Sequence, residues 1–592
     1  MRLRLLAVAT LLAGPLAAQS PAPRVLHTVE VRDPATRAFH VTSRFLRVDQ
    51  LPQRWIDLAL PTWTPGWYVI EDYAKHVRRL EFTDGRGKRL PWYMTDRSTW
   101  RVDTRGASEV QARFEYEAVA LGLNQARITD DWAFFTGTQL FLEPVGYTQW
   151  ASSVRFARPD GWRLLTSLRD TDDSLTFTAA NYHELVDATT QMGRFDAKRF
   201  EVDGKPHWFI AAPAGALSGA QLDTMADHAA RIARVQARVF AGTLPYPKYL
   251  YHYFFLPAET NAGGGLEHAN SHVSIVGPLG DASPTAFSGL LAHEFFHLWN
   301  VKRLRPAEMW PYDYSDENVT PNLWVSEGFT NYYASMTLLR AGLQDRARFL
   351  AQAANAITTV ESNEARSFVS IADASTSTWL GYDRPQAFTV NYYAGGQVVA
   401  AMLDLAILHH TNGAARLDEV LRTLWREQWA RGQGFTRAQF QRAVDRTARH
   451  DLGTFVQRMV DWRQVPPYDS LLAFAGYRLD RTERQLPVMG MTMRTVAEGN
   501  LVQSVTPGGG AERAGLRVGD VVVSLEGQPI ARADLAQQIG REVRLEVLRG
   551  GERRTHRLRM TGRAAPSFRI VELPQVSEAQ RRIRELWLAA DR

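Results

Sequence analysis

The sequence predicts a multidomain α+β protein with an all-β N-terminal domain, a mixed and then mainly helical central domain, and a C-terminal domain of short strands. Three observations lead to this prediction. Residues 25–180 alternate apolar and polar side chains between turn residues, which is the period of half-buried strands. From residue 221 the apolar spacing changes to three and four, the period of amphipathic helices, and this continues with interruptions to residue 462. After residue 486, short strand-like runs separated by glycines return.

The length of the chain determines how many domains are expected. A chain of 592 residues is longer than one hydrophobic core usually organises. Pro466 and Pro467 interrupt the helical pattern, so we place a boundary between residues 465 and 485. The predicted division is a signal peptide at residues 1–18, an N-terminal β domain at 22–180, a central domain at 181–470, a C-terminal domain at 485–563 and a tail helix at 564–592.

The first residues have the layout of a secretory signal peptide. Arg2 and Arg4 precede an apolar run at residues 5–13, and small residues follow, with cleavage expected after Ala18. The run is too short to span a bilayer, which needs about 20 apolar residues, and no later stretch of the sequence qualifies. We therefore expect a protein without a membrane span that is periplasmic or secreted.

Composition and charge narrow the possible chemistry. The sequence contains no cysteine, so thiolates are excluded as nucleophiles and as metal ligands, and any metal must be held by histidines and carboxylates. The formal net charge of +6 includes Arg2 and Arg4, so the chain without its signal peptide carries 6 − 2 = +4. This is a small excess for so large a protein, and we expect no nucleic-acid partner.

One motif in the predicted helix at residues 283–299 has the spacing of a metal site. His293 and His297 are four residues apart, so their side chains share one face of the helix and can reach one ion. Zinc accepts neutral imidazole nitrogens, and the intervening Glu294 can take a proton from water at an open coordination position. The alternative is a surface helix whose two histidines have structural partners.

A catalytic zinc site needs a third protein ligand, and Glu327 is the best candidate. It opens a predicted helix at residues 325–340 and can face back toward the histidines. The alternative reading is a carboxylate that stabilises the helix dipole. A reserve group of acidic residues lies in the connection between the two helices, namely Glu308, Asp313, Asp316 and Glu317.

Two further segments fit a peptide-cleaving site. Gly264 and Gly265 precede a strand-like run and allow another backbone to approach closely, while Glu267 can bind a free α-ammonium group. Read alone, this segment is a flexible turn. Tyr392 and Tyr393 stand at the start of a predicted helix, where a hydroxyl can stabilise an oxyanion, although aromatic residues at helix starts usually belong to the core.

The sequence resembles the glycyl aminopeptidase family of zinc metallopeptidases, whose catalytic domain is related in pattern to the thermolysin-like aminopeptidases. Residues 293–303 are similar to the family's zinc helix, 324–333 to its third-ligand helix, 264–268 to its exopeptidase segment and 60–68 to its N-terminal β domain. The resemblance implies one Zn²⁺ on His293, His297 and Glu327, with Glu294 as general base. It also implies substrate contacts at Gly264, Gly265 and Glu267, and an oxyanion contact at Tyr393.

The resemblance extends to a C-terminal PDZ module. Residues 500–527 follow the order of bacterial protease PDZ modules, and residues 486–491 correspond to the loop that would bind a peptide C-terminus. Two departures from the related aminopeptidases stand out. Gly395 occupies a position where they commonly carry lysine, which leaves Tyr392 as an alternative to Tyr393. The step of 30 residues from His297 to Glu327 implies an insertion at about residues 305–322.

The predicted function is hydrolysis of N-terminal residues from peptides by zinc-activated water, and the resemblance implies glycine or alanine as the residue removed. Two alternatives stay open. The first is a zinc endopeptidase guided to its substrates by the PDZ module. The second is an inactive scaffold that binds peptides.

Overall fold

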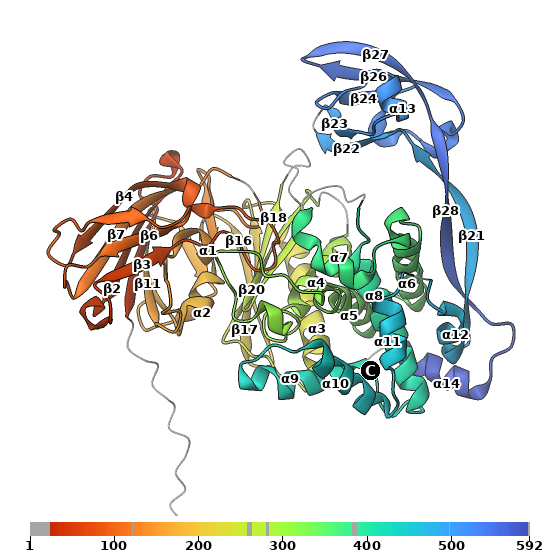
Figure 1. Ribbon diagram of the computed structural model, residues 1–592, viewed down its shortest axis with the longest axis horizontal. Helices are drawn as coiled ribbons and strands as arrows, with labels where there is room; N and C mark the ends of the chain where they lie inside the picture. Colours follow the sequence, from red (N-terminus) through yellow and green to blue (C-terminus); the bar gives the residue numbers. More distant parts are fainter. Residues whose placement is uncertain are drawn as a thin grey trace, which may run out of the picture.

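The computed structural model describes residues 24–120, 122–256, 263–279, 283–381, 388–463, 465–496 and 498–589. It contains an N-terminal β region, a central region that combines one sheet with many helices, and a C-terminal β region raised on a two-stranded ribbon (Figure 1). The predicted α+β architecture is thereby confirmed. The predicted signal peptide at residues 1–18 lies outside the described residues. Among the helices described, none has both the length and the apolar character needed to cross a membrane.

The N-terminal region is built from three sheets, and the largest has the order β13-β14-β11-β1-β2-β7-β4. Strand β2 (Ala38–Leu46) buries Phe39, Val41 and Phe45 in alternation with more exposed residues, so one face packs into the core. The other strands of this sheet are β1 (Val25–Glu30), β4 (Val77–Asp84), β7 (Glu109–Glu117), β11 (Ser152–Ala157), β13 (Arg169–Asp170) and β14 (Thr176–Ala179). The second sheet of this region comprises β3 (Trp55–Ala59), β5 (Trp92–Met94), β6 (Thr99–Asp103) and β10 (Glu143–Pro144). The third comprises β8 (Arg127–Ile128), β9 (Trp132–Thr136), β12 (Arg163–Thr166) and β15 (Thr189–Gly193).

The central region begins with a sheet of order β16-β17-β18-β20-β19. Every residue of β18 (Tyr249–Phe255) is buried, as expected for a strand covered on both faces. Strand β19 (Gly264–His268) is the last of the order and pairs with β20 (Ser271–Val276), and no other strand of the described residues lies at its second edge. The remaining elements of this layer are β16 (Asp196–Val202), β17 (Lys205–Ala212) and the long helix α3 (Gly219–Val239).

The helices of the central region surround α8 (Tyr392–His410), which is buried along most of its length. They are α4 (Ser288–Phe296), α5 (Phe329–Arg340), α6 (Arg346–Glu361), α7 (Ile371–Thr376), α9 (Leu417–Glu427), α10 (Arg437–Ala448) and α11 (Gly453–Val460). The helical pattern that continues to residue 462 is divided after α10, where Arg449 adopts a left-handed conformation (φ 52°).

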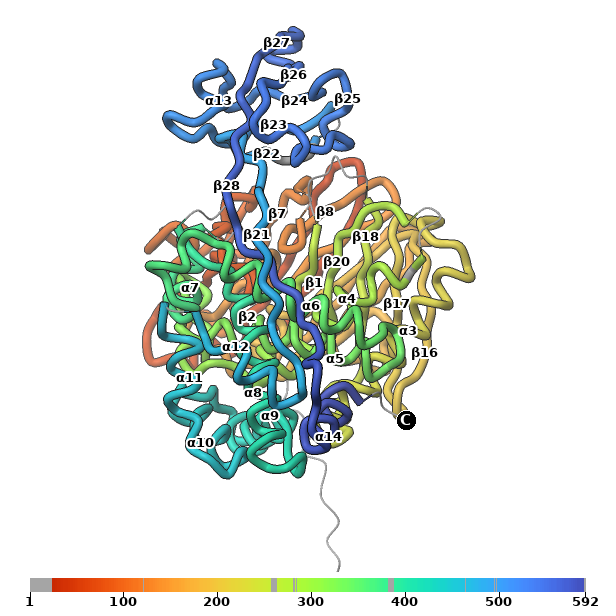
Figure 2. The backbone as a smooth tube through the Cα atoms, turned by 90° about the vertical axis from the view of Figure 1, so that its right-hand side faces the viewer, coloured from red at the N-terminus to blue at the C-terminus, as the bar shows by residue number. Residues whose placement is uncertain are grey.

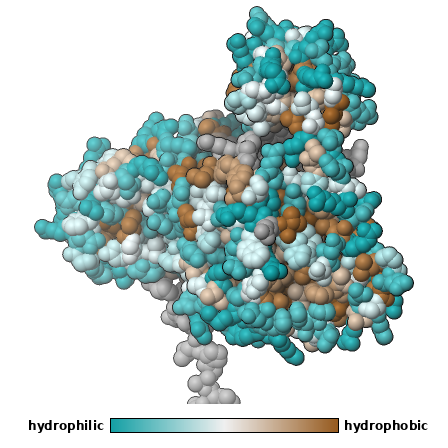
Figure 3. Space-filling model, turned by 45° about the vertical axis from the view of Figure 1, so that its right-hand side comes forward, coloured by the Kyte–Doolittle hydropathy of each residue, from teal (hydrophilic) through white to brown (hydrophobic). Residues whose placement is uncertain are grey.

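The C-terminal region stands on a ribbon formed by β21 (Tyr477–Val488) and β28 (Thr561–Glu572), which pair along their whole lengths (Figure 2). The ribbon carries a small sheet that includes β22 (Met491–Val496), β23 (Gly499–Val505), β24 (Val521–Leu525), β26 (Glu542–Arg549) and β27 (Glu552–Arg559). Strand β28 of the ribbon lies against α6, where the Phe568 amide donates to Thr358 Oγ1 at 3.1 Å. The chain then ends in α14 (Glu578–Trp587), whose Trp587 is fully buried among the helices. On the face drawn in Figure 3, apolar side chains form scattered groups between hydrophilic ones.

Candidate metal centre

The two histidines of the metal motif lie one turn apart at the end of α4. Their Nε2 atoms are 3.0 Å apart, so both can face one ion. The Nδ1 atom of His297 lies 2.9 Å from the carbonyl oxygen of Asn300. When Nδ1–H donates to that carbonyl, the lone pair on Nε2 is directed toward the neighbouring histidine and any ion between them.

Glu327 meets the two histidines from a π-helical turn, η7 (Trp324–Gly328), that leads into α5. Its Oε2 atom is 3.2 Å from Nε2 of His297 and 3.5 Å from Nε2 of His293. The turn is tied to the zinc-motif segment by Asn300, whose Nδ2 atom donates to the carbonyl oxygens of Val325 and Ser326 at 2.9 Å each. The structure thus brings the predicted third residue to the two histidines.

Close backbone approach makes this position of Glu327 possible. A Cβ on Gly328 would lie 2.2 Å from the Cα of Gly396, and a Cβ on Gly396 would lie 2.0 Å from the carbonyl oxygen of Trp324. Both distances are far below van der Waals contact. Only glycine at both positions lets α8 pack against the turn that carries Glu327.

The acidic residues in the connection between the two helices, considered above as reserve ligands, do not join the two histidines. None of Glu308, Asp313, Asp316 and Glu317 belongs to a metal-compatible group in the described part of the chain. The connection instead holds the N-terminal region, because Trp63 Nε1 donates to the carbonyl oxygen of Asp313 at 2.8 Å and the Thr62 amide donates to that of Tyr314 at 2.8 Å.

Glu294 points from α4 toward the edge strand β19. A Cβ on Gly265 would lie 2.2 Å from its Oε1 atom, so the carboxylate lies against a backbone that must be glycine. Burial, reinforced by the nearby carboxylate of Glu267 and opposed by the imidazole of His297, raises the pKa of Glu294 well above its ordinary value. A carboxylate with a raised pKa accepts a proton more readily, which suits a general base.

Glu267 converges on the same point from β19. Carboxylate and imidazole atoms of Glu267, Glu294 and His297 lie within 4.8 Å of one another. The Oε1 atom of Glu267 is buried and has no hydrogen-bond partner among the described residues. Gly66 of the N-terminal region covers it, since a Cβ at that position would lie 2.7 Å from both carboxylate oxygens. The N-terminal region therefore forms one wall of the site.

A buried lysine fixes that wall. Lys302 Nζ donates to the carbonyl oxygen of Pro65 at 3.0 Å and to Asp187 Oδ1 at 2.9 Å. The other carboxylate oxygen of Asp187 accepts from the Ala269 amide at 2.6 Å, just after β19. One cation thus links the loop that contains Gly66 to the strand that contains Glu267.

The donor set fits a divalent cation. Two imidazoles and one carboxylate converge, with 4% exposure at Glu267, 4% at Glu294 and 2% at Glu327. Burial alone would lower the pKa of His297, but the carboxylates of Glu327, Glu267 and Glu294 together outweigh burial and raise it to about 10. The surroundings therefore favour positive charge at this point, and two histidines with a carboxylate are ligands that zinc accepts.

Comparison with known proteins confirms the predicted resemblance. The description "M61 glycyl aminopeptidase" matches residues 286–399, "Peptidase M61 N-terminal domain" matches 27–194 and "PDZ domain" matches 487–560. The N-terminal, central and C-terminal regions are thus similar to an M61 N-terminal domain, an M61 glycyl aminopeptidase and a PDZ domain. No curated protein matches the chain.

One solved structure shares the fold over nearly the whole chain, and a second is less similar. An aminopeptidase N family protein from Idiomarina loihiensis is 22% identical over 95% of this chain and 100% of its own, with a TM-score of 0.80. An M1 zinc metallopeptidase from Deinococcus radiodurans is 15% identical over 75% of this chain and 94% of its own, with a TM-score of 0.48.

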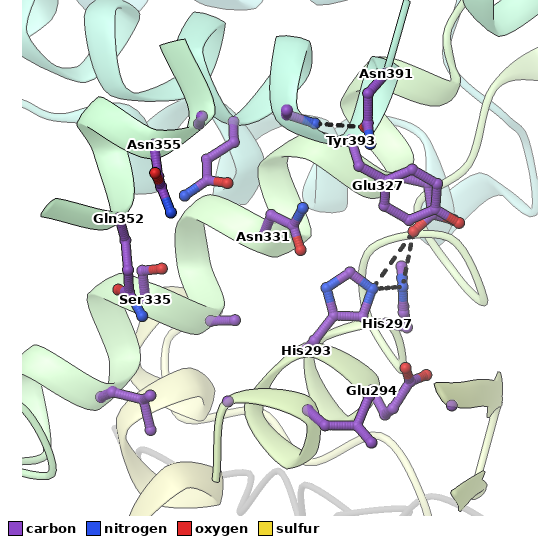
Figure 4. A pocket seen from close by; sticks show the side chains of 18 of the residues that line it. His293, Glu294, His297, Glu327, Asn331, Ser335, Gln352, Asn355, Asn391 and Tyr393 are labelled. Carbon is purple, nitrogen blue, oxygen red and sulfur yellow. Dashed lines mark hydrogen bonds and ion pairs between the residues drawn. The ribbon is translucent and has the colours of Figure 1, made fainter. Parts of the chain in front are cut away.

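A cavity of about 640 Å³ extends from the converging side chains. His293, Glu294 and Glu327 lie at one end, and Gln352 and Asn355 of α6 lie at the other (Figure 4).

The two tyrosines at the start of α8 differ in their placement. Tyr393 lines the cavity, and its ring centroid is 6.3 Å from that of His293. The hydroxyl of Tyr392 instead accepts a hydrogen bond from Thr378 Oγ1 at 2.9 Å in the buried core. Tyr393 is therefore the tyrosine positioned beside the histidines.

Sequence reasoning does not single out Gly66, Asn300 or Lys302, although all three shape the site. Gly66 lies within residues 60–68, which resemble the family's N-terminal β domain but have no predicted role at the site. Asn300 and Lys302 lie within the segment that resembles the zinc helix, but spacing alone assigns them no role. Their contributions depend on contacts with distant parts of the chain.

Proposed function

We propose that this protein is an exported zinc aminopeptidase that removes small N-terminal residues from peptides. The observation that carries the proposal is the convergence of His293, His297 and Glu327 beside Glu267, whose carboxylate has an oxygen without a partner among the described residues. The first three residues supply a metal site, and the fourth supplies a site for a positively charged amine. The match of residues 286–399 to the M61 glycyl aminopeptidases supports both assignments.

In the proposed reaction, a zinc ion held by His293, His297 and Glu327 would polarise the scissile carbonyl and lower the pKa of a water molecule. Glu294 takes a proton from the attacking water and later delivers it to the leaving amine. Tyr393 donates a hydrogen bond to the carbonyl oxygen as negative charge develops on it.

Glu267 is proposed to select free N-termini. A buried carboxylate pairs favourably with an α-ammonium group, and no described residue forms a hydrogen bond with the Oε1 atom of Glu267. The backbone at Gly66 covers the carboxylate of Glu267. A substrate amine bound by Glu267 lies close to the histidines, so the peptide bond that is cleaved is the one after the first residue. The resemblance to glycyl aminopeptidases favours glycine or alanine at that position.

The central experiment compares the protein with its Glu294→Gln variant. We expect the variant to keep zinc, measured by metal analysis, and to lose nearly all hydrolysis of alanyl and glycyl amides, because the base is gone. Robust turnover by the variant would refute the mechanism. Absence of zinc from protein purified without chelators would favour the inactive scaffold.

A second comparison separates the aminopeptidase from the endopeptidase. One peptide sequence is assayed with a free and with an acetylated N-terminus. The aminopeptidase is expected to cleave only the free peptide, since acetylation removes the charge that Glu267 binds. Faster cleavage of the acetylated peptide would favour an endopeptidase guided by the PDZ module.

Export and the PDZ module are parts of the same proposal. The signal peptide predicted at residues 1–18 is expected to be absent from protein recovered from the periplasm or medium, which N-terminal sequencing tests. The PDZ region at residues 487–560 is proposed to bind a peptide C-terminus.

A further inference from the structure

The cavity continues well beyond the converging histidines and carboxylates. Its far walls are the facing sides of α5 and α6, which contribute Asn331 and Ser335 from the first helix and Gln352 and Asn355 from the second (Figure 4). Gln397 of α8 also lines it. We call this far part the amide groove, defined by Asn331, Gln352, Asn355 and Gln397.

The four side chains of the amide groove share an unusual property. Within the described ranges, none of them has a side-chain hydrogen bond to the rest of the protein, and the Gln352 Oε1 atom is buried without a partner. Buried polar atoms normally find partners, so the unpartnered Oε1 atom of Gln352, with three further amides facing the same cavity, points to a ligand that supplies the missing hydrogen bonds. Each amide offers both a donor and an acceptor, which are the groups of a peptide main chain.

The charge of the cavity excludes one end of a peptide from it. Among the described residues that line it, none is lysine or arginine, whereas Glu267, Glu294 and Glu327 are acidic. A free C-terminal carboxylate inside the groove would find no lysine or arginine to pair with, and the acidic side chains lie at the other end of the same cavity. A substrate whose carboxylate lies beyond the groove avoids this repulsion.

The direction of the groove assigns it to one side of the scissile bond. Glu267, which is proposed to bind the α-ammonium group, lies with Glu294 at the β19 side of the histidines. Gln352 and Asn355 lie on the opposite side of the histidines in Figure 4. A peptide with its N-terminus at Glu267 and its first peptide bond at the histidines must continue into the amide groove.

The length of the groove follows from helix geometry. Asn331, Ser335 and Leu338 line it from α5, a span of seven residues that corresponds to about 10 Å at 1.5 Å per residue. An extended peptide rises about 3.3 Å per residue, so about three residues fill the groove.

We infer that the amide groove binds the main chain of about three residues after the scissile bond, so that the substrates are extended peptides whose C-terminal carboxylate lies outside the cavity. This inference rests on the proposed aminopeptidase function. Because the amides contact the main chain, the groove accepts many sequences and selects for length.

The first test uses the zinc-loaded full chain and two substrates with the same first residue, alanine p-nitroanilide and an alanine pentapeptide amide. A double variant, Gln352→Met with Asn355→Leu, removes two amides at nearly constant volume. We expect kcat/KM for the pentapeptide to fall about tenfold through a higher KM, while the anilide is unaffected because it is too short to reach Gln352 and Asn355 at the far end of the groove. Gln457→Met is the matched control, since this exposed glutamine lies on α11 outside the cavity.

Equal effects of the double variant on both substrates, or no effect on either, would overturn the inference. A second test needs no variant and compares dialanine with dialanine amide. We expect the amide to be hydrolysed at least about tenfold more efficiently, because its neutral end enters the acidic cavity. Equal rates would also overturn the inference. Failure of the unmodified chain to hydrolyse any free-amine substrate would instead refute the proposed function.

Discussion

Replacement of Gly66 by alanine tests whether the N-terminal region positions Glu267. The new Cβ would lie 2.7 Å from both oxygens of Glu267 and 2.8 Å from Cδ1 of Leu266. An ordinary contact needs at least about 3.4 Å, so the carboxylate must move by several tenths of an ångström. Glu267 is buried, so its carboxylate has little free space into which it can move.

The expected loss follows from that displacement. Misplacement of a binding group by about 1 Å costs up to about a hundredfold in rate, and the smaller shift here is expected to lower kcat/KM by about ten- to a hundredfold. Gly66 also has a φ of +108°, which alanine adopts only with strain of about 1 kcal/mol. Strain alone would lower stability and leave recognition of the amine intact.

The control separates these two effects. Gly146 also has a positive φ, +83°, and a Cβ there would meet nothing within 4 Å, so Gly146→Ala introduces strain without a clash. The assay measures zinc content, Tm and kcat/KM on alanine p-nitroanilide for both variants. Normal kcat/KM in Gly66→Ala, or an equal loss in Gly146→Ala, would refute the assignment of Gly66 to the amine site.

Three further predictions concern the metal, pH and the PDZ module. Glu327→Gln is expected to weaken zinc binding by more than about a hundredfold in competition with a chelator, because it removes a charged ligand. Burial raises the pKa of Glu143 from 4.5 to about 7. Between these pH values the folded state holds a proton that the unfolded state has lost, so Tm is expected to fall as the pH rises from about 4.5 to about 7. The variant Glu143→Gln is expected to reduce this dependence of Tm on pH. Joining Val488 to Thr561 by a two-residue turn removes the PDZ module, and we expect kcat/KM for alanine p-nitroanilide to stay within about twofold.

Each of these has a contrary result. Unchanged zinc affinity in Glu327→Gln would mean that another carboxylate is the third zinc ligand. An unaltered pH slope in Glu143→Gln would assign that slope to other groups. Loss of folding on excision of the PDZ module would show that the module stabilises the central region. A truncation after residue 485 is the comparison, and it is expected to misfold because it also removes Phe568 and Trp587 from their buried positions.

The parts of the site that the sequence predicts are those fixed by local geometry. His293, Glu294 and His297 follow from helical spacing, because residues four apart share a face wherever the helix lies. Glu327 depends on a π-helical turn and on the close contact of Gly328 with Gly396, which join distant segments. Spacing therefore could not place it, and the family resemblance was needed.

Two other features escape the sequence for similar reasons. Tyr392 and Tyr393 are about 100° apart around α8, so only the packing of the helix decides which one faces the cavity. The contact of Gly66 with Glu267 joins two regions far apart in the chain. The fold class was accessible because periods of two and 3.6 residues extend over long stretches.

The ribbon that carries the PDZ module has a consequence for modularity. Its two strands leave and re-enter the central region side by side, and Val488 pairs directly with Thr561. Paired residues of antiparallel strands have Cα atoms only about 5 Å apart. The module is thus joined to the enzyme as an insertion in a hairpin, even though it is near the C-terminus in sequence. Any domain whose two ends lie that close together can be exchanged for it without disturbing α14, which makes this ribbon a natural grafting point.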